Sequence, residues 1–191
     1  TTPSDADYQA GQDAVPVFSG SDLSTLEAGQ AIVALNVTVS GVIDQGETLQ
    51  VDGATVALRD GTSVTTEHGL NVTVVVENST ATLVITSAEG LSAEVAAALV
   101  NGLAYANNGE QVTTGERILT LISVQDSGGT ASGGIDTTSL TIAATITVGN
   151  SAPQATDSDV ILPGATQTEQ YSTTLPATLF KDVNGDALSW Q

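Results

Sequence analysis

The sequence predicts an all-β protein, an antiparallel β-sandwich with one short helix inserted at about residues 92–103. Short runs rich in β-branched residues recur along the chain, with turn signals between them. Aromatic residues make up only 3% of the chain, so we expect a core of Val, Leu, Ile and Ala, as in many thin sandwiches. One Ala-rich stretch departs from the strand pattern and has the spacing of a helix.

The expected strands are separated by Gly, Asn and Asp. They cover residues 31–39, 48–51, 54–58, 70–77, 81–87, 116–124 and 139–148. Asp52-Gly53 is a strong signal for a tight hairpin between the second and third of them. A Gly-rich loop at 126–136 connects the last two.

The helix has a defined start and an apolar face. Ser92 suits the N-cap, and Glu94 lies in the first turn, where the helix dipole favours an acid. Gly102 is the first residue that interrupts the helical pattern. The apolar residues that share one face are Val95, Ala98, Leu99 and Leu103.

Charge and cysteine content exclude several classes of function. The chain has 22 Asp and Glu against 3 Lys and Arg, a formal charge of −19. Nucleic-acid binding needs a basic footprint, and an anionic membrane surface repels such a chain. No apolar run approaches the roughly 20 residues of a membrane span, which argues against direct insertion. The absence of Cys removes disulfides, thiol catalysis and zinc-thiolate sites.

An internal repeat of about 138 residues is expected. Pro16 and Pro153 are 137 residues apart, Asp44 and Asp182 are 138 apart, and Gly46 and Gly185 are 139 apart. The sequence therefore predicts a polar leader or linker at 1–13 and a complete repeat at 14–149. A linker and the incomplete start of a second repeat are expected at 150–191.

Several motifs occur in an order that resembles a known family. They are Leu26-Glu27-Ala-Gly29, Val124-Gln-Asp126-Ser-Gly128, Asn150-Ser-Ala-Pro153 and Phe180-Lys-Asp182-Val-Asn184-Gly185-Asp186-Ala-Leu188. Together they resemble the cadherin-like repeats of large bacterial surface adhesins of the RTX type, including the dystroglycan-type subset. The resemblance implies an Ig/cadherin-like sandwich, secretion to the cell surface and Ca²⁺ bound between neighbouring repeats.

Calcium binds carboxylate, amide and carbonyl oxygens in a flexible geometry, and the acids here gather at turns. The candidate ligands are Glu27, Asp44, Glu47, Asp126, Asp136, Asp157, Asp159, Asp182, Asn184 and Asp186. Two positions depart from the family pattern, because Ser151 and Asn184 stand where an Asp is expected. The alternative for each single acid is that Asp and Asn favour turns by bonding their own backbone.

The expected function is that of a calcium-binding spacer repeat of an extracellular bacterial adhesin or surface protein. One alternative is a calcium-dependent module that binds a surface glycan or protein. Another is a self-assembling surface or filament subunit, in which residues 150–191 donate strands to a second copy. An enzyme is not expected: His68 is the only His, and adjacent strand residues such as Glu67 and His68 point to opposite faces.

Overall fold

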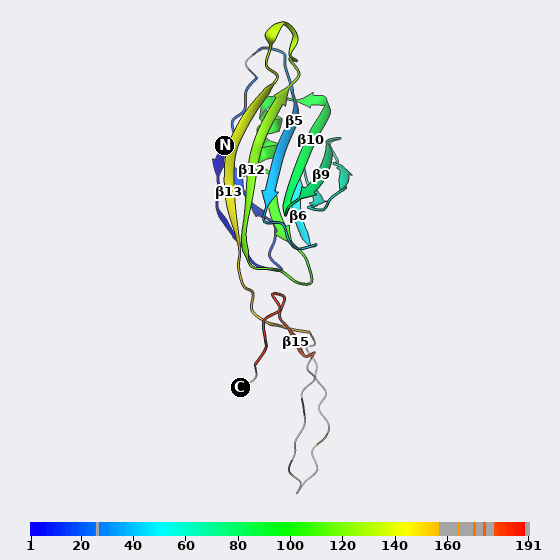
Figure 1. Cartoon of the computed structure of the whole chain (residues 1–191), viewed down its shortest axis with the longest axis vertical. Coiled ribbons are helices and arrows are strands. Elements are labelled where there is room, and N and C mark those ends of the chain that lie inside the picture. The colour runs from blue at the N-terminus through cyan, green and yellow to red at the C-terminus, as the bar shows by residue number, and fades with distance from the viewer. Residues whose placement is uncertain (26, 157–163, 165–169, 171–173, 175–177, 190–191) are drawn as a thin grey trace.

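The computed structural model describes residues 1–25, 27–156, 164, 170, 174 and 178–189. Within them the chain folds as an all-β sandwich of two sheets with a short α-helix, which confirms the predicted fold class. Figure 1 shows the sandwich upright, with the loop of residues 127–136 at one end and the C-terminal segment beyond the other. Calcium, adhesion and the division into repeats stay predictions.

The larger sheet has, among the described residues, seven strands in the spatial order β2-β13-β12-β5-β10-β9-β8. In that order they are Ala6–Tyr8, Thr137–Val148, Gly115–Asp126, Ile32–Ser40, Thr80–Leu91, Asn71–Glu77 and Ser63–Thr65. Neighbours pair antiparallel, except that β2 runs parallel to β13. Valines and leucines alternate toward the core while Thr and Ser face outward, the pattern of a sheet buried on one face.

The smaller sheet has the order β3-β11-β6-β7 in the described part of the chain. In that order its strands are Val15–Pro16, Ala104–Asn107, Glu47–Val51 and Ala54–Ala57. Between β6 and β7, Asp52 and Gly53 have φ of 49° and 73°, the left-handed conformations that a tight type I′ hairpin requires. The predicted hairpin is therefore present.

Two short strand pairs lie outside these two sheets. β1 (Thr2–Pro3) pairs with β4 (Phe18–Ser19), and β14 (Gln154–Ala155) pairs with β15 (Phe180–Lys181). The second pair lies beyond the end at which β13 leaves the sandwich (Figure 1).

Helix α1 (Ala93–Asn101) lies within the predicted range. The Ser92 hydroxyl accepts a hydrogen bond from the Val95 N–H at 3.3 Å, as an N-cap does, and the Gly102 N–H bonds the last carbonyls. The residues buried against the core are Ala96, Leu99 and Val100, whereas the Val95 side chain is 52% exposed. A short 3₁₀ turn, η1 (Ala131–Gly133), lies in the 127–136 loop.

Residues 1–13 depart from the expected polar leader, because β1 and β2 lie within them. Tyr8 is fully buried and packs edge-to-face on Tyr105, with ring centroids 5.5 Å apart. The Tyr8 hydroxyl donates to the Asn107 carbonyl at 2.8 Å, which satisfies its buried polar group. The segment before residue 14 thus contributes to the sandwich core, which its polar composition does not indicate.

Candidate functional site

The predicted ligands lie at opposite ends of the sandwich. Asp44, Glu47, Asp182, Asn184 and Asp186 lie at the linker end, which is formed by residues 9–12, 41–47, 108–114 and 149–151 with the 182–186 loop. The far end, formed by residues 20–25, 27–31, 87–91 and 126–136, carries Glu27, Asp126 and Asp136. The remaining two candidates, Asp157 and Asp159, lie outside the described residues.

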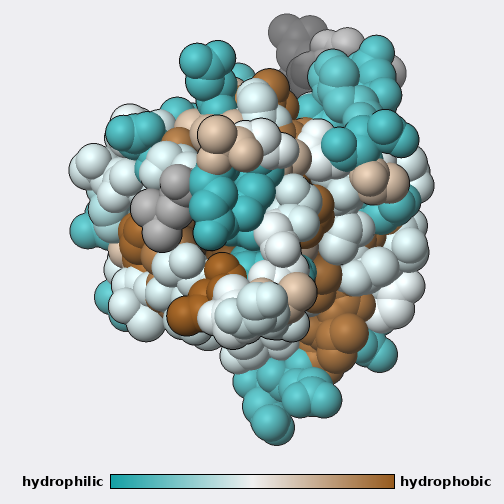
Figure 2. Space-filling view, turned by 90° about the horizontal axis from the view of Figure 1, so that it is seen from above, coloured by the Kyte–Doolittle hydropathy of each residue, from teal (hydrophilic) through white to brown (hydrophobic). Residues whose placement is uncertain are grey.

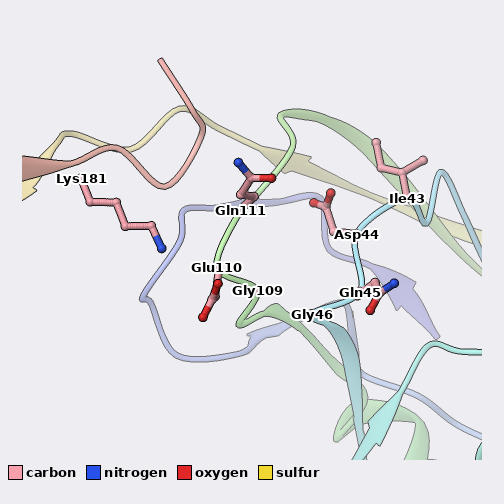
Figure 3. A pocket seen from close by; sticks show the side chains of 8 residues that line it. All are labelled: Ile43, Asp44, Gln45, Gly46, Gly109, Glu110, Gln111 and Lys181. Atoms are coloured by element: carbon pink, nitrogen blue, oxygen red, sulfur yellow. The ribbon is translucent and has the colours of Figure 1, made fainter. Parts of the chain in front are cut away.

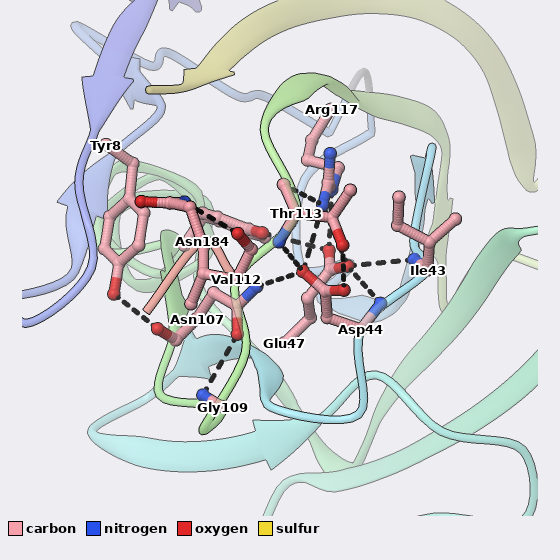
Figure 4. Close-up of polar contacts among 11 residues, drawn as sticks. Tyr8, Ile43, Asp44, Glu47, Asn107, Gly109, Val112, Thr113, Arg117 and Asn184 are labelled. Carbon is pink, nitrogen blue, oxygen red and sulfur yellow. Dashed lines mark hydrogen bonds and ion pairs between the residues drawn. The ribbon is translucent and has the colours of Figure 1, made fainter. Parts of the chain in front are cut away.

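Glu47 is the centre of a buried ion pair at the linker end. Its side chain is 0% exposed, and that of Arg117 is 1% exposed. Glu47 Oε2 accepts a hydrogen bond from Arg117 Nε at 2.9 Å (Figure 4). It also accepts one from the Tyr105 hydroxyl at 2.9 Å. Oε1 accepts from the N–H groups of Ile43 and Asp44 at 2.9 and 2.8 Å and from Arg117 at 3.2 Å. Both carboxylate oxygens are therefore fully used by the protein.

The pKa values of the partners reflect this burial. Burial is the largest influence on Tyr105, and together with the neighbouring Glu47 charge it raises the pKa of the phenol far above its ordinary value. For Arg117, burial works to lower the pKa, but the hydrogen bond and charge of Glu47 outweigh it, so the pKa is raised. The guanidinium therefore stays charged and the phenol stays protonated as a donor.

Asp44 joins the same network from the rim. Its carboxylate accepts from Asn107 Nδ2 at 2.8 Å and from the N–H and the hydroxyl of Thr113, each at 2.7 Å. Arg117 is 3.5 Å away. Burial works to raise the pKa of Asp44, but the bonds from Thr113 and Asn107 and the Arg117 charge hold it below its ordinary value. Asp44 and Glu47, two of the candidate calcium ligands, thus lie around a guanidinium.

The second acidic loop caps itself and then contacts the sandwich. Asp182 Oδ1 accepts from the N–H groups of Asn184 and Asp186 at 2.8 and 3.1 Å, while Gly185 takes a φ of 80° at the bend. Asn184 bridges two other segments: its Oδ1 accepts from the Ser151 N–H and its Nδ2 donates to the Val112 carbonyl, both at 2.7 Å. The Val112 N–H donates to the Val183 carbonyl at 2.8 Å. Three hydrogen bonds therefore dock this loop on the linker end.

Ser151 extends the contact to the N-terminal segment. It is 7% exposed, and its hydroxyl accepts from the Ala10 N–H at 3.1 Å. The two positions that depart from the family pattern, Ser151 and Asn184, are thus joined by a direct hydrogen bond at the junction.

An open cavity of about 570 Å³ lies beside the junction. Its walls come from the loops 43–46 and 109–111, and Lys181 of β15 lies across from Asp44 (Figure 3). Two carboxylates, Asp44 and Glu110, and one ammonium therefore share a single opening.

At the far end a glutamine lies between two of the predicted ligands. Gln30 Nε2 donates to Glu27 Oε2. A Cβ added at Gly128 would collide with the Gln30 amide and would be 3.0 Å from Asp126 Oδ1. Gln30 Oε1 is buried, and no donor reaches it among the described residues. Sequence reasoning missed Gln30, although it stands three residues after Glu27 and just before a strand.

Asp136, the third acid of this end, is bound separately. Its carboxylate accepts from Gln125 Nε2 at 3.1 Å and from the Thr137 hydroxyl at 3.0 Å, and these bonds lower its pKa. Its carbonyl accepts from the Asp126 N–H at 2.8 Å, which closes the loop of residues 127–135. Figure 2 looks down on this end and shows mostly hydrophilic and intermediate residues, with hydrophobic ones between them.

His68 has a partner that the sequence does not predict. Its Nδ1 lies 2.8 Å from Asp52 Oδ1, and the Asp52 Oδ2 accepts from the Thr66 hydroxyl at 2.6 Å. The His68 side chain is 75% exposed, in agreement with a solvated turn. The sequence does indicate a turn at Asp52-Gly53. Only the fold, however, brings that turn beside His68.

In the described part of the chain, no group of three or more His, Cys, Asp or Glu side chains has the arrangement of a metal site. None of the helices found there is long and apolar enough to cross a membrane. Comparison with protein-family models, curated proteins and solved structures finds no match to this chain.

Proposed function

We propose that this chain is a structural spacer repeat of an extracellular bacterial adhesin or surface protein. The observation that carries the proposal is the docking of the Asp182–Asp186 loop on the linker end through Asn184, Val112 and Val183. Peptide groups that bond across a junction restrict the rotation of the next segment of the chain, and a spacer needs such restriction. The stacked neighbours are further repeats of the same protein.

Calcium is the second part of the proposal, and the far end supports it best. Glu27 and Asp126 supply two carboxylates near the Gln30 amide, whose Oε1 is a buried oxygen with no donor among the described residues. A buried acceptor left without a partner costs about 1–3 kcal/mol, and a calcium ion would remove that cost because it binds amide oxygens as well as carboxylates. We propose Glu27, Gln30 and Asp126 as ligands, completed by a neighbouring repeat.

The remaining predicted ligands have different places in the proposal. Asp182, Asn184 and Asp186 would face the next repeat, with Asp157 and Asp159 as candidates in the linker. Asp44 and Glu47 already have a cation in Arg117, so they are not needed as ligands. Binding of calcium would also reduce the mutual repulsion of a chain that carries a charge of −19.

Thermal unfolding in calcium and in chelator tests the metal. Calcium at a hundredfold excess over its Kd should stabilise the fold by about 2.7 kcal/mol and raise the melting temperature. Glu27→Gln and Asp126→Asn should each reduce that rise, whereas Glu77→Gln, which removes an exposed acid on β9, should not. Magnesium at the same ionic strength controls for screening. Equal melting curves in calcium and chelator would sink the calcium proposal.

The spacer is tested independently of metal. The chain has no Cys, so Thr147→Cys on β13 and Ala187→Cys after the docked loop give a unique pair for spin labels. Docking predicts one narrow distribution of distances between the two labels, in chelator as well as in calcium. A distribution as broad as that of a flexible linker would contradict the spacer.

A further inference from the structure

Part of the apolar face of helix α1 borders an open groove. Val95, Ala98 and Leu99 recur at the spacing of one helical face, and Gly102 lies at the helix end. Of these, Val95 is 52% exposed and Ala98 is exposed, whereas Leu99 is buried with Ala96 and Val100 against the core. Val95 and Ala98 therefore leave part of this face open to solvent beside the groove.

The groove has the size and composition of a binding site. Its volume is about 520 Å³, within the roughly 300–1,000 Å³ that ligand pockets span. The floor is apolar and comes from three separate segments of the chain, with Leu70, Leu91 and Leu99 beside Val95 and Ala98. The rim is polar, with Asp52 and Gly53 from the β6–β7 turn and Glu67 and His68 from a later loop.

The charge on the rim is fixed in position. Asp52 is held by the Thr66 hydroxyl at 2.6 Å and by His68 at 2.8 Å. Thr66 is 5% exposed and in turn accepts from the Leu70 N–H at 3.1 Å. A series of hydrogen bonds therefore connects the Asp52 carboxylate on the rim to Leu70 on the floor. Because the carboxylate is already ordered, binding a ligand does not cost the entropy of fixing it.

We propose that this groove binds a peptide segment of a partner protein in which an aliphatic side chain stands next to Lys or Arg. The apolar floor takes the aliphatic side chain, and Asp52 and Glu67 on the rim attract the cation. A second copy of this chain is a poor occupant, because two chains with a charge of −19 repel each other. The site is distinct from the docked loop and from Glu27, Gln30 and Asp126, and it adds a binding role to the proposed spacer.

Three short peptides separate the contributions of apolar contact and charge. Acetyl-Lys-Leu-Leu-Lys-amide is the probe, and the versions with Glu or Gln in place of Lys are its controls. In methyl NMR titrations we expect the Lys peptide to shift the signals of Leu91, Val95 and Leu99 and to bind at least about tenfold more tightly than the Glu peptide. Equal binding of all three peptides, or shifts spread evenly over other exposed methyls such as Ile43, would overturn the proposal.

Two variants with matched controls locate the site. Val95→Gln should weaken the Lys peptide about tenfold, whereas Val75→Gln on β9, equally exposed at 52%, should leave binding unchanged. Asp52→Asn should weaken it severalfold and reduce the preference for the Lys peptide over the Gln peptide, because Asn keeps the left-handed turn but removes one of the two rim charges. An unchanged melting temperature shows that each variant folds. Binding unaffected by both variants, or self-association through this groove in sedimentation, would contradict the assignment.

Discussion

Two acidic turns that the sequence presents as copies, Asp44–Glu47 and Asp182–Asp186, have different roles in the structure. In the first, Glu47 is fully buried and its partners Tyr105 and Arg117 come from 58 and 70 residues further along the chain. In the second, Asp182 accepts from the N–H groups of Asn184 and Asp186, two and four residues away. The acid of the first turn is therefore held in the core by distant residues, whereas the acid of the second bonds within its own turn.

The difference between the turns is concentrated in one residue. The second turn has Asn184 before its Gly, whereas the first goes from Asp44 through Gln45 to Gly46. Asn184 is the residue that docks, with one bond to Ser151 and one to Val112. A local pattern of acid, Gly and acid therefore specifies a turn, while the role of that turn depends on which distant groups the fold brings to it.

The largest effect should come from breaking the buried ion pair. Glu47→Gln keeps the volume but leaves the Arg117 charge without its main partner. We expect the free energy of unfolding to fall by about 3–5 kcal/mol, measured by urea denaturation with coincident fluorescence and circular dichroism.

A double variant tests whether the loss comes from the unpaired Arg117 charge. In Glu47→Gln with Arg117→Met the uncompensated charge is gone, and the double variant should be more stable than Glu47→Gln alone. A loss below about 1 kcal/mol in the single variant would contradict the central place of this pair.

Asp44 gives a smaller effect and a pH dependence. Its folded pKa lies below the ordinary 3.8, so its contribution to stability is present above that value and is lost as the pH falls through the folded pKa. Asp44→Asn should cost about 1–3 kcal/mol at neutral pH, since its amide cannot accept all the bonds from Thr113 and Asn107. The difference between wild type and variant should shrink in acid denaturation below about pH 4. A difference that stays constant into strong acid would show that the Asp44 charge contributes nothing.

The docked turn should respond locally. Asn184→Ala removes the bonds to Ser151 and Val112, at about 1 kcal/mol each, without touching the core. Hydrogen exchange at the Val112 N–H should accelerate by about tenfold or more, while exchange at Leu121 in β12 stays unchanged. Asn150→Ala, which changes an exposed Asn in the same linker, is the matched control. Equal acceleration at the Val112 and Leu121 amides would mean that the turn and the core open together, which contradicts a local role.

Local signals predicted the elements of this fold well. The Asp52-Gly53 hairpin and the helix with its Ser92 cap depend on conformations that a few adjacent residues determine. Tyr8 was missed because the polar residues around it in the sequence do not indicate a buried strand. It reaches the core because β2 pairs parallel with β13.

The candidate site was less predictable because its contacts join distant segments. Arg117 was not expected beside Asp44 and Glu47, since nothing near it in the sequence indicates that partner. The Asp52–His68 pair was missed for the same reason. Gln30 stands close to Glu27 in the sequence, but nothing there indicates that Gly128 lies beside it. Sequence patterns identified the residues whose side-chain oxygens could bind a cation. The topology decides whether those oxygens face a guanidinium, a peptide N–H or an open surface.

The smallest effect should come from Asp186, which occupies in the second turn the place of Glu47 in the first. The residue is exposed, and its backbone N–H is the part that bonds Asp182, so Asp186→Asn keeps that contact. In chelator we expect the free energy of unfolding to change by less than about 0.5 kcal/mol, against the roughly 3–5 kcal/mol for Glu47. In calcium the same variant becomes informative, because an ion held by Asp182, Asn184 and Asp186 would lose a ligand and the calcium-induced rise in melting temperature would decrease. A variant that is neutral in both conditions leaves this turn a docking element alone, and the calcium proposal then depends on Glu27, Gln30 and Asp126.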